Sequence, residues 1–173
     1  DANTAETFTN SAKLSLFGPE FHDAEVVNNI KLKWSLRTRK SGFYYVAGDV
    51  FELRISYTLT KEIENLRIGI PFFNTQGEML LGPDTRNFPS KETLGTKGNH
   101  EVTMYLNPLP INKGRLWLTL TICQDPAHLY RKHIESFDIV NSKNEYGTMF
   151  TNPIWDVAAA GEHLKEINYT DCE

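Results

Sequence analysis

The sequence predicts an all-β protein in which short antiparallel strands form a sandwich. First, apolar and polar residues alternate in several segments, and this period of two puts successive side chains on opposite faces of a strand. Second, turn-forming runs such as Asn74 to Gly77 and Gly82 to Asp84 separate those segments. Evenly spaced segments of this kind are typical of immunoglobulin and jelly-roll sandwiches. We expect eight or nine strands.

The first half of the chain carries a lead-in and four of these segments. Residues 1–27, rich in Asn, Thr and Ala, are interpreted as a linker and irregular lead-in. In segment 30–37 the alternation places Trp34 inward. The segments that follow are FYYV at 43–46, VFELRISYTLT at 50–60 and LRIGIPFF at 66–73. Each has one apolar face, so each sheet is expected to have one face in the core and one in water.

The second half continues in the same way. Its segments are VTMYL at 102–106, RLWLTLTIC at 115–123, a run that ends in Phe137 and Ile139, and a last strand near 149–155. We therefore expect the sandwich to span residues 28–157. Residues 158–173 form a C-terminal tail in which AAAGEHLKEI favours a helix that Gly161 weakens.

Composition narrows the classes of function. At 173 residues and 40% hydrophobic content, the chain suits one domain. A net charge of -4 without a basic stripe argues against nucleic acid as a partner. Two isolated cysteines, Cys123 and Cys172, favour a reducing compartment. The chain begins at Asp1 rather than Met, and we expect it to be a piece of a longer protein.

Motifs for catalysis are missing from the sequence. It contains no Walker A motif, no dinucleotide-binding glycine pattern, no G-x-S-x-G and no H-E-x-x-H. Asp125, His128 and His133 straddle a loop and a strand start, so we predict no metal site and no cofactor. The outward carboxylates of Glu52, Glu101 and Asp138 fall on different strands, and nothing pairs them at the roughly 5 to 10 Å that glycosidases need.

The strongest lead to a function is Trp117. Strand phase puts Leu116, Leu118, Leu120 and Ile122 in the core, and it puts Trp117 on the other face with Arg115, Thr119, Thr121 and Cys123. An indole ring can stack on the apolar face of a sugar, and the short polar side chains around it can bind hydroxyl groups. The alternative is that a loop or a second subunit covers the ring.

Segment 66–73 offers a second row of outward residues, Arg67, Gly69, Pro71 and Phe73. If it pairs with the strand of Trp117, the two rows form a shallow surface on which Gly69 leaves room for a ligand. Tyr44 is a further candidate for sugar contact. The predicted carbohydrate site is thus Trp117, Thr119, Thr121, Arg115, Arg67, Phe73 and Tyr44, and its two arginines make an anionic end group plausible.

The order of landmarks resembles a known family. These landmarks are Gly48-Asp49 before a long strand, G-x-x-L-x-G-x-x-T at 77–85, L-P-x-x-x-G at 109–114 and a late Trp155. Together they cover about residues 28–157 and resemble the C-terminal domain of Wzt-type proteins, the nucleotide-binding subunits of ABC transporters that export O-antigen polysaccharides.

The resemblance implies both a fold and a role. The fold would be an immunoglobulin-like β-sandwich, and the role would be non-catalytic binding of a finished polysaccharide, often at a modified non-reducing end, which licenses export. It also implies a homodimer that sometimes exchanges the last strand, an ATP-binding cassette domain N-terminal to this chain, a membrane transporter subunit, and a cytoplasmic location at the inner membrane.

Two other classes of function stay open. A glycan-processing enzyme would bring two carboxylates together beside Trp117. An immunoglobulin-like protein-interaction domain would bury Trp117 under protein. A carbohydrate-binding module would leave the ring open in a shallow groove.

Overall fold

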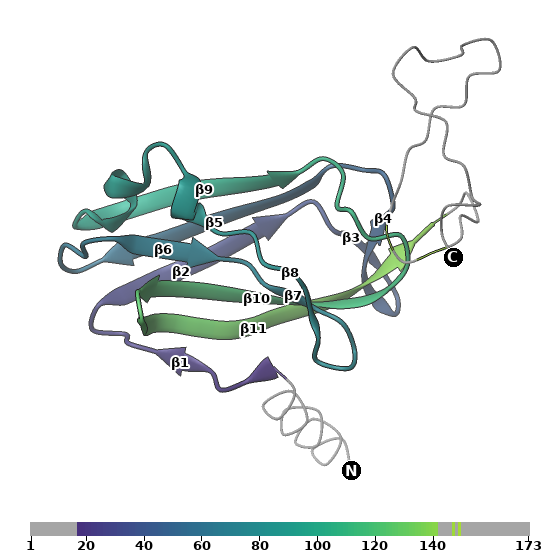
Figure 1. Ribbon diagram of the computed structural model, residues 1–173, viewed down its shortest axis with the longest axis horizontal. Helices are drawn as coiled ribbons and strands as arrows, with labels where there is room; N and C mark the ends of the chain where they lie inside the picture. Colours follow the sequence, from purple (N-terminus) through teal and green to yellow (C-terminus); the bar gives the residue numbers. More distant parts are fainter. Residues whose placement is uncertain (1–16, 142–146, 148, 150–173) are drawn as a thin grey trace, which may run out of the picture.

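The structure, a computed structural model, describes residues 17–141, 147 and 149, and within them the chain forms two packed sheets (Figure 1). The elements in chain order are β1 (Phe21–His22), β2 (Val27–Trp34), β3 (Arg37–Arg39), β4 (Gly42–Val46), β5 (Phe51–Leu59), β6 (Leu66–Gly69), β7 (Phe72–Phe73), β8 (Met79–Leu81), the short 3-10 helices η1 (Thr85–Asn87) and η2 (Lys91–Gly95), β9 (Gly98–Leu106), β10 (Gly114–Gln124) and β11 (Ala127–Val140).

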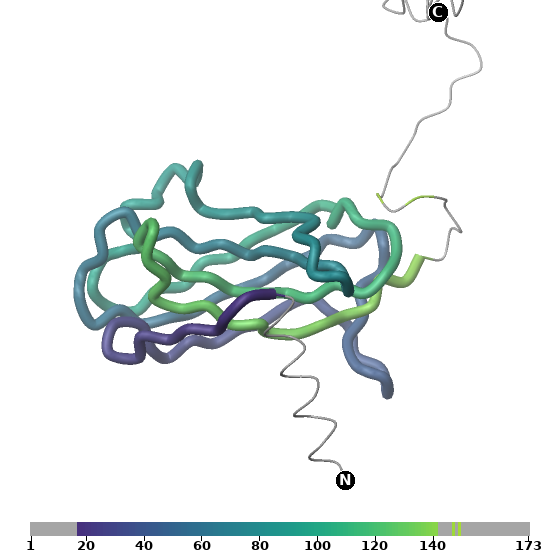
Figure 2. Tube along the Cα trace, turned by 60° about the horizontal axis from the view of Figure 1, so that its bottom comes forward, coloured from purple at the N-terminus to yellow at the C-terminus, as the bar shows by residue number. Residues whose placement is uncertain are grey.

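The larger sheet has the order β3-β4-β11-β10-β7-β8, with β1 beside β11 and β6 beside β10. The smaller sheet has the order β2-β5-β9. All pairs are antiparallel except β4 with β11, which run parallel. Figure 1 shows β1 along the outer side of β11, and in Figure 2 the purple N-terminal segment lies beside the green tube of the later strands. The long hairpin of β10 and β11 is therefore the centre of the larger sheet.

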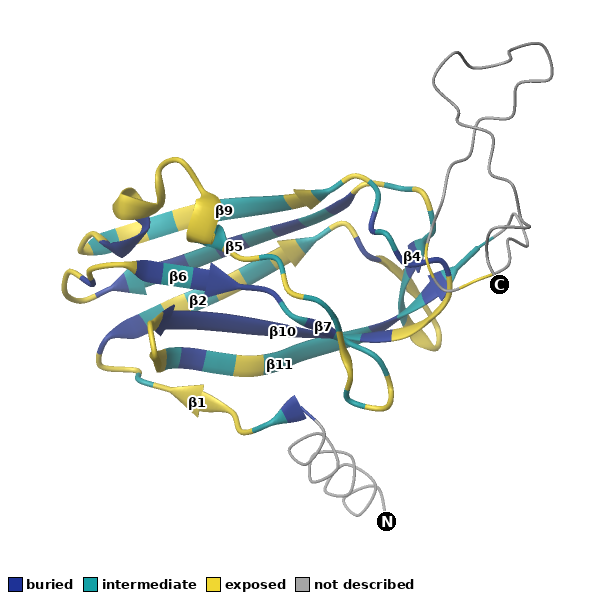
Figure 3. Cartoon of the chain, viewed as in Figure 1, coloured by how far each residue is buried: buried dark blue, intermediate teal, exposed yellow. Residues whose placement is uncertain are grey.

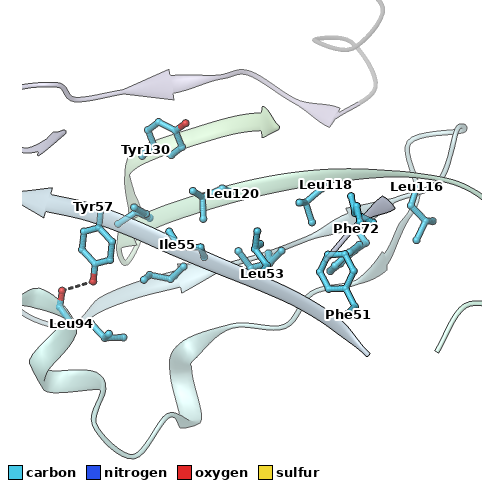
Figure 4. Close-up of a cluster of buried hydrophobic side chains, with 14 of the residues drawn as sticks. Phe51, Leu53, Ile55, Tyr57, Phe72, Leu94, Leu116, Leu118, Leu120 and Tyr130 are labelled. Atoms are coloured by element: carbon cyan, nitrogen blue, oxygen red, sulfur yellow. Dashed lines mark hydrogen bonds between the residues drawn. The ribbon is translucent and has the colours of Figure 1, made fainter. Parts of the chain in front are cut away.

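The core lies between the sheets, where the alternating positions of β5 and β10 face each other. Phe51, Leu53 and Ile55 come from β5, and Leu116, Leu118 and Leu120 from β10 (Figure 4). The hydroxyl of Tyr57 also lies in the core, and it donates a hydrogen bond of 2.7 Å to the carbonyl oxygen of Leu94. A buried hydroxyl that is paired in this way avoids a desolvation penalty.

The predicted fold class is confirmed. Every expected strand before residue 141 is present, and the strand phase is right for β2, β5 and the inner face of β10. The strand count is higher because segment 66–73 divides into β6 and β7 around Ile70-Pro71, and because β1, β3 and β8 are short additions. Proline lacks the N–H group that a continuous ladder requires.

Parts of the predicted domain organisation fall outside the described residues. These parts are residues 1–16, most of the last strand near 149–155, and the tail at 158–173. Within the lead-in predicted for 1–27, the structure places β1 and the first residue of β2. No helix in the described part of the chain is long and apolar enough to cross a bilayer.

Candidate functional site on the outer face of the larger sheet

Strand register arranges the outer face of the larger sheet into two adjacent rows. In one row Arg115 of β10 lies opposite Asp138 of β11, which lies opposite Tyr44 of β4. In the next row Trp117 lies opposite Phe73 of β7 on one side and a serine of β11 on the other. These residues face outward because their neighbours along each strand, such as Leu116 and Phe137, belong to the core. The predicted pairing of segment 66–73 with β10 is thus confirmed.

The first row is a charged cluster around Asp138. Arg115 binds this carboxylate through two nitrogens, with Nε 2.7 Å from Oδ1 and Nη2 3.1 Å from Oδ2. Arg39 adds a third contact at 2.5 Å, and its guanidinium carbon lies 5.4 Å from the centre of the Tyr44 ring. The hydrogen bond from Arg115 is the main reason that the pKa of Asp138 lies below its ordinary value. Asp138 is therefore an acceptor and a counter-ion at neutral pH.

The second row is aromatic, and residue 17 covers part of it. The ring of Phe17 lies 5.4 Å from the ring of Trp117 and 5.3 Å from that of Phe73, measured between centroids. Phe17 itself is only 3% exposed, whereas Trp117 and Phe73 are partly buried. Trp117 is neither fully open nor fully buried. The cover comes from the chain's own N-terminal segment.

The expectation that Thr119 and Thr121 face water is wrong. Thr119 is fully buried, and its hydroxyl lies 2.9 Å from Nδ1 of His133. Thr121 is 9% exposed, and its hydroxyl donates to the carbonyl oxygen of Gly69 at 3.1 Å. A Cβ at Gly69 would lie 2.7 Å from the same hydroxyl oxygen, so Thr121 fills the room that we expected a ligand to use. The middle of β10 is accordingly dark blue in Figure 3.

Arg67 does not join the surface around Arg115. It lies opposite Cys123 on β10, eight residues from Arg115, which corresponds to roughly 26 Å along a strand. Its guanidinium pairs with Asp125 at 3.1 Å, beside a cleft of about 490 Å³ that includes Arg86 and Glu64. The structure therefore separates the two arginines that the sequence analysis placed beside one end group.

Of the three carboxylates considered for catalysis, Asp138 lies directly across from Arg115. The other two carboxylates considered for catalysis, Glu52 and Glu101, lie on the smaller sheet. Both contact Arg54, at 3.5 and 3.7 Å respectively. Of these three carboxylates, Asp138 is thus the one on the larger sheet, and it is bound by Arg115 and Arg39.

Sequence reasoning missed four residues that shape this face, namely Phe17, Arg39, Arg131 and His133. Phe17 lay in the segment taken as linker, and Arg39 looked like a solvated turn residue. His133 was considered only as a metal ligand, but its ring binds Thr119 and the carbonyl oxygen of Gly18 at 3.0 Å. No group of three His, Cys, Asp or Glu side chains suited to a metal occurs among residues 17–141, 147 and 149.

The described part of the chain defines a class, a β-sandwich domain with a polar and aromatic outer sheet face. Comparison with family models gives a match over residues 27–151 to the Wzt C-terminal domain. The chain belongs to the Wzt C-terminal domain family, which provides non-catalytic domains of O-antigen transporters and so implies an ABC transporter context.

One solved structure supports this fold. The chain is similar to a crystal structure of the C-terminal domain of wzt, with a TM-score of 0.53, 11% identity, and coverage of 79% of this chain and 96% of the other. A weaker similarity links it to chicken MD-1 complexed with lipid IVa, with a TM-score of 0.36, 11% identity, and coverage of 60% and 77%. Among the curated proteins compared with this chain, none matches.

Proposed function

We propose that this chain is a non-catalytic carbohydrate-binding module that recognises an O-antigen polysaccharide, at its non-reducing end, and couples that recognition to export. The observation that supports it is the row of Tyr44, Asp138 and Arg115 beside the row of Trp117 and Phe73. Aromatic faces stack on pyranose rings, while carboxylate and guanidinium groups bind hydroxyl groups.

The chemistry of the charged row favours binding over hydrolysis. A glycosidase needs a carboxylic acid whose pKa is raised, so that it can donate a proton to the leaving group. Arg115 lowers the pKa of Asp138, which is the opposite direction. The two arginines also fix the carboxylate oxygens in place before a ligand arrives, which reduces the entropy lost on binding.

The family context suggests partners and a location. We expect an ATP-binding cassette domain on the N-terminal side of the chain, a membrane transporter subunit, and a cytoplasmic position at the inner face of the inner membrane. We also expect a homodimer that buries the segment after Gly147, either in its own sandwich or exchanged with the neighbour. A sedimentation experiment that shows a monomer at roughly tens of micromolar would count against the dimer.

The test is a titration of the chain against a panel of O-polysaccharides. Tyr44→Ala should weaken binding by about tenfold or more, because a stacked ring contributes on the order of 1 to 3 kcal/mol. Tyr105→Ala is the matched control, since Tyr105 is 60% exposed on β9 of the other sheet. Equal losses in the two variants, or no loss in Tyr44→Ala, would contradict the assignment of the face.

A second candidate, a protein-interaction domain, is favoured by one observation, the contact of Phe17 with Trp117. An aromatic side chain held by an outer sheet face is also what a bound peptide would present. The same panel separates the two candidates, because an interaction domain would bind none of the polysaccharides.

A further inference from the structure

The segment Phe17–His22, here called the strap, runs from the outer face of the larger sheet, where Phe17 packs against Trp117, to the edge of β11. Its last two residues pair with β11, with Phe21 opposite Arg131 and His22 opposite Tyr130. Before them, Oε1 of Glu20 accepts a hydrogen bond of 2.9 Å from the backbone N–H of His133. Phe21 is 50% exposed, so the strap is held mainly at its start, where Phe17 is buried.

The strap places one ring and two carbonyl oxygens on the sheet. The ring of Phe17 packs against Trp117, Phe73 and His133, with the last centroid 5.4 Å away. The carbonyl oxygen of Phe17 accepts a hydrogen bond from Nη2 of Arg131, and that of Gly18 lies 3.0 Å from Nε2 of His133. Because a carbonyl oxygen can only accept, Nε2 is the donor to Gly18, and in a neutral imidazole Nδ1 then accepts from the Thr119 hydroxyl.

Arg131 is incompletely satisfied under the strap. Its Nε is buried and has no hydrogen-bond partner, and none of the ion pairs among the described residues involves this guanidinium. A guanidinium has five N–H donors in a fork that suits the two oxygens of a carboxylate. Among the described residues its acceptor is one neutral oxygen, the carbonyl of Phe17. Burial also lowers the pKa of Arg131.

We propose that the strap is a displaceable cover and that the surface beneath it, formed by Trp117, Phe73, Arg131 and His133, is a binding site for an acidic pyranose such as a uronate. The sugar ring replaces the Phe17 ring on Trp117, its carboxylate binds Arg131, and a hydroxyl oxygen accepts from His133. This inference rests on the proposed carbohydrate-binding function, and it adds the class of sugar and the way in which access is controlled.

The free-energy cost of opening the strap is small enough for an acidic sugar to displace it. Opening the strap exposes one phenylalanine and breaks a few hydrogen bonds, which is a small part of the sandwich. An acidic sugar restores the ring contact and offers a carboxylate to Arg131, which the closed strap contacts through the carbonyl oxygen of Phe17. When the strap is closed in most molecules, the apparent affinity equals the intrinsic affinity multiplied by the fraction of molecules in which the strap is open. A neutral sugar gains no ion pair, so it competes poorly with Phe17.

The first test measures amide hydrogen exchange in the full chain in the presence of D-glucuronate or D-galacturonate. The corresponding neutral hexoses, D-glucose and D-galactose, are the control ligands. Displacement of the strap removes Glu20 from the His133 amide, and it frees the Asp23 amide, which donates to Leu129 at 2.8 Å. We expect both amides to exchange faster when a uronate binds, with little change for the hexoses. Uronate binding with unchanged or slower exchange would overturn the strap inference.

The second test uses variants in saturation-transfer NMR with the same sugars. Phe17→Ala should tighten uronate binding at least fivefold, whereas Phe21→Ala, on the exposed end of the strap, should not. Arg131→Met should weaken uronate binding at least tenfold and leave the hexoses unaffected, and melting temperatures identify any variant that has simply lost its fold. If Phe17→Ala does not tighten binding, or if no uronate binds to any folded variant, the inference is wrong. The titration of O-polysaccharides with Tyr44→Ala judges the proposed function separately.

Discussion

Asp138 shows how one residue can organise a surface. Its carboxylate receives three hydrogen bonds from two arginines that are 76 residues apart in the sequence, Arg39 on β3 and Arg115 on β10. The side chain of Asp138 is 25% exposed, so the cluster stays accessible from water. Such a cluster holds its oxygen and nitrogen atoms in fixed positions, which is what recognition of a hydroxyl pattern requires.

The lowered pKa of Asp138 predicts a pH dependence of stability. Its folded pKa lies below the ordinary value of 3.8, so its ion pairs stabilise the fold fully above that value and are lost as the pH falls through the folded pKa. The difference in unfolding free energy between wild type and Asp138→Asn should therefore be constant above about pH 5 and shrink in acid.

A carboxyl titration by NMR checks the cause of this shift. Arg115→Met removes the largest contribution, so the midpoint of the Asp138 titration should move upward toward 3.8. An unchanged midpoint in this variant would show that Arg115 is not responsible.

At the scale of elements, the hairpin of β10 and β11 explains why the charged row escaped sequence analysis. Gln124 pairs with Ala127 across the turn, and simple counting from that pair places Arg115 opposite Ser136. Two register shifts, between Ile122 and Cys123 and between Leu118 and Thr119, move its partner to Asp138. Alternation along one strand is readable from sequence, but a bulge in the partner strand leaves no comparable pattern.

The same limit applies to burial of the outer face. Strand phase correctly separated Leu118 from Thr119, but it could not show that Thr119 is buried, with its hydroxyl against His133. The strap comes from residues without alternation, so nothing local marks it as part of the sheet. Core positions are set by local pattern, while covers and ion pairs depend on contacts between distant segments.

The 3-10 helix η2 gives a prediction at this scale. A Cβ added at Gly95 would lie 2.0 Å from the carbonyl oxygen of Ile63, and the N–H of Ile63 donates to Gly95 at 2.7 Å. Gly95→Ala should therefore push the two segments apart. It should lower the free energy of unfolding, measured by thermal denaturation, by ~2 kcal/mol or more.

Gly82→Ala is the control for this substitution. Its nearest neighbour would be the flexible end of Met79, with the sulfur 3.4 Å away, so the change should be small. Similar melting temperatures for both variants would contradict the packing argument.

At the scale of the whole molecule, the two sheets present different outer faces. The larger sheet carries the rows of Tyr44 and Trp117, whereas the smaller sheet carries Glu52, Arg54 and Glu101. If recognition is confined to the larger sheet, Glu101→Gln should leave the polysaccharide affinity within about threefold of wild type. This corresponds to a change in binding free energy under ~0.7 kcal/mol. Asp138→Asn should weaken it more, because it frees both arginines from their fixed positions.

The proposed non-catalytic role predicts that the bound polymer is not changed. Incubation for a day should return a cognate polysaccharide with the same length and end groups, with or without divalent metal. Shortening that disappears in Glu52→Gln, Glu101→Gln or Asp138→Asn would instead make the chain a glycan-processing enzyme.

The central claim is that the outer face of the larger sheet binds the polysaccharide, and the most direct measurement is a map of backbone amide shifts during titration with an O-polysaccharide that binds. We predict that the largest shifts fall on β4, β10 and β11, at Tyr44, Trp117 and Asp138, and that β2, β5 and β9 barely respond. Shifts concentrated on the smaller sheet, or in the cleft beside Arg67, would contradict the account.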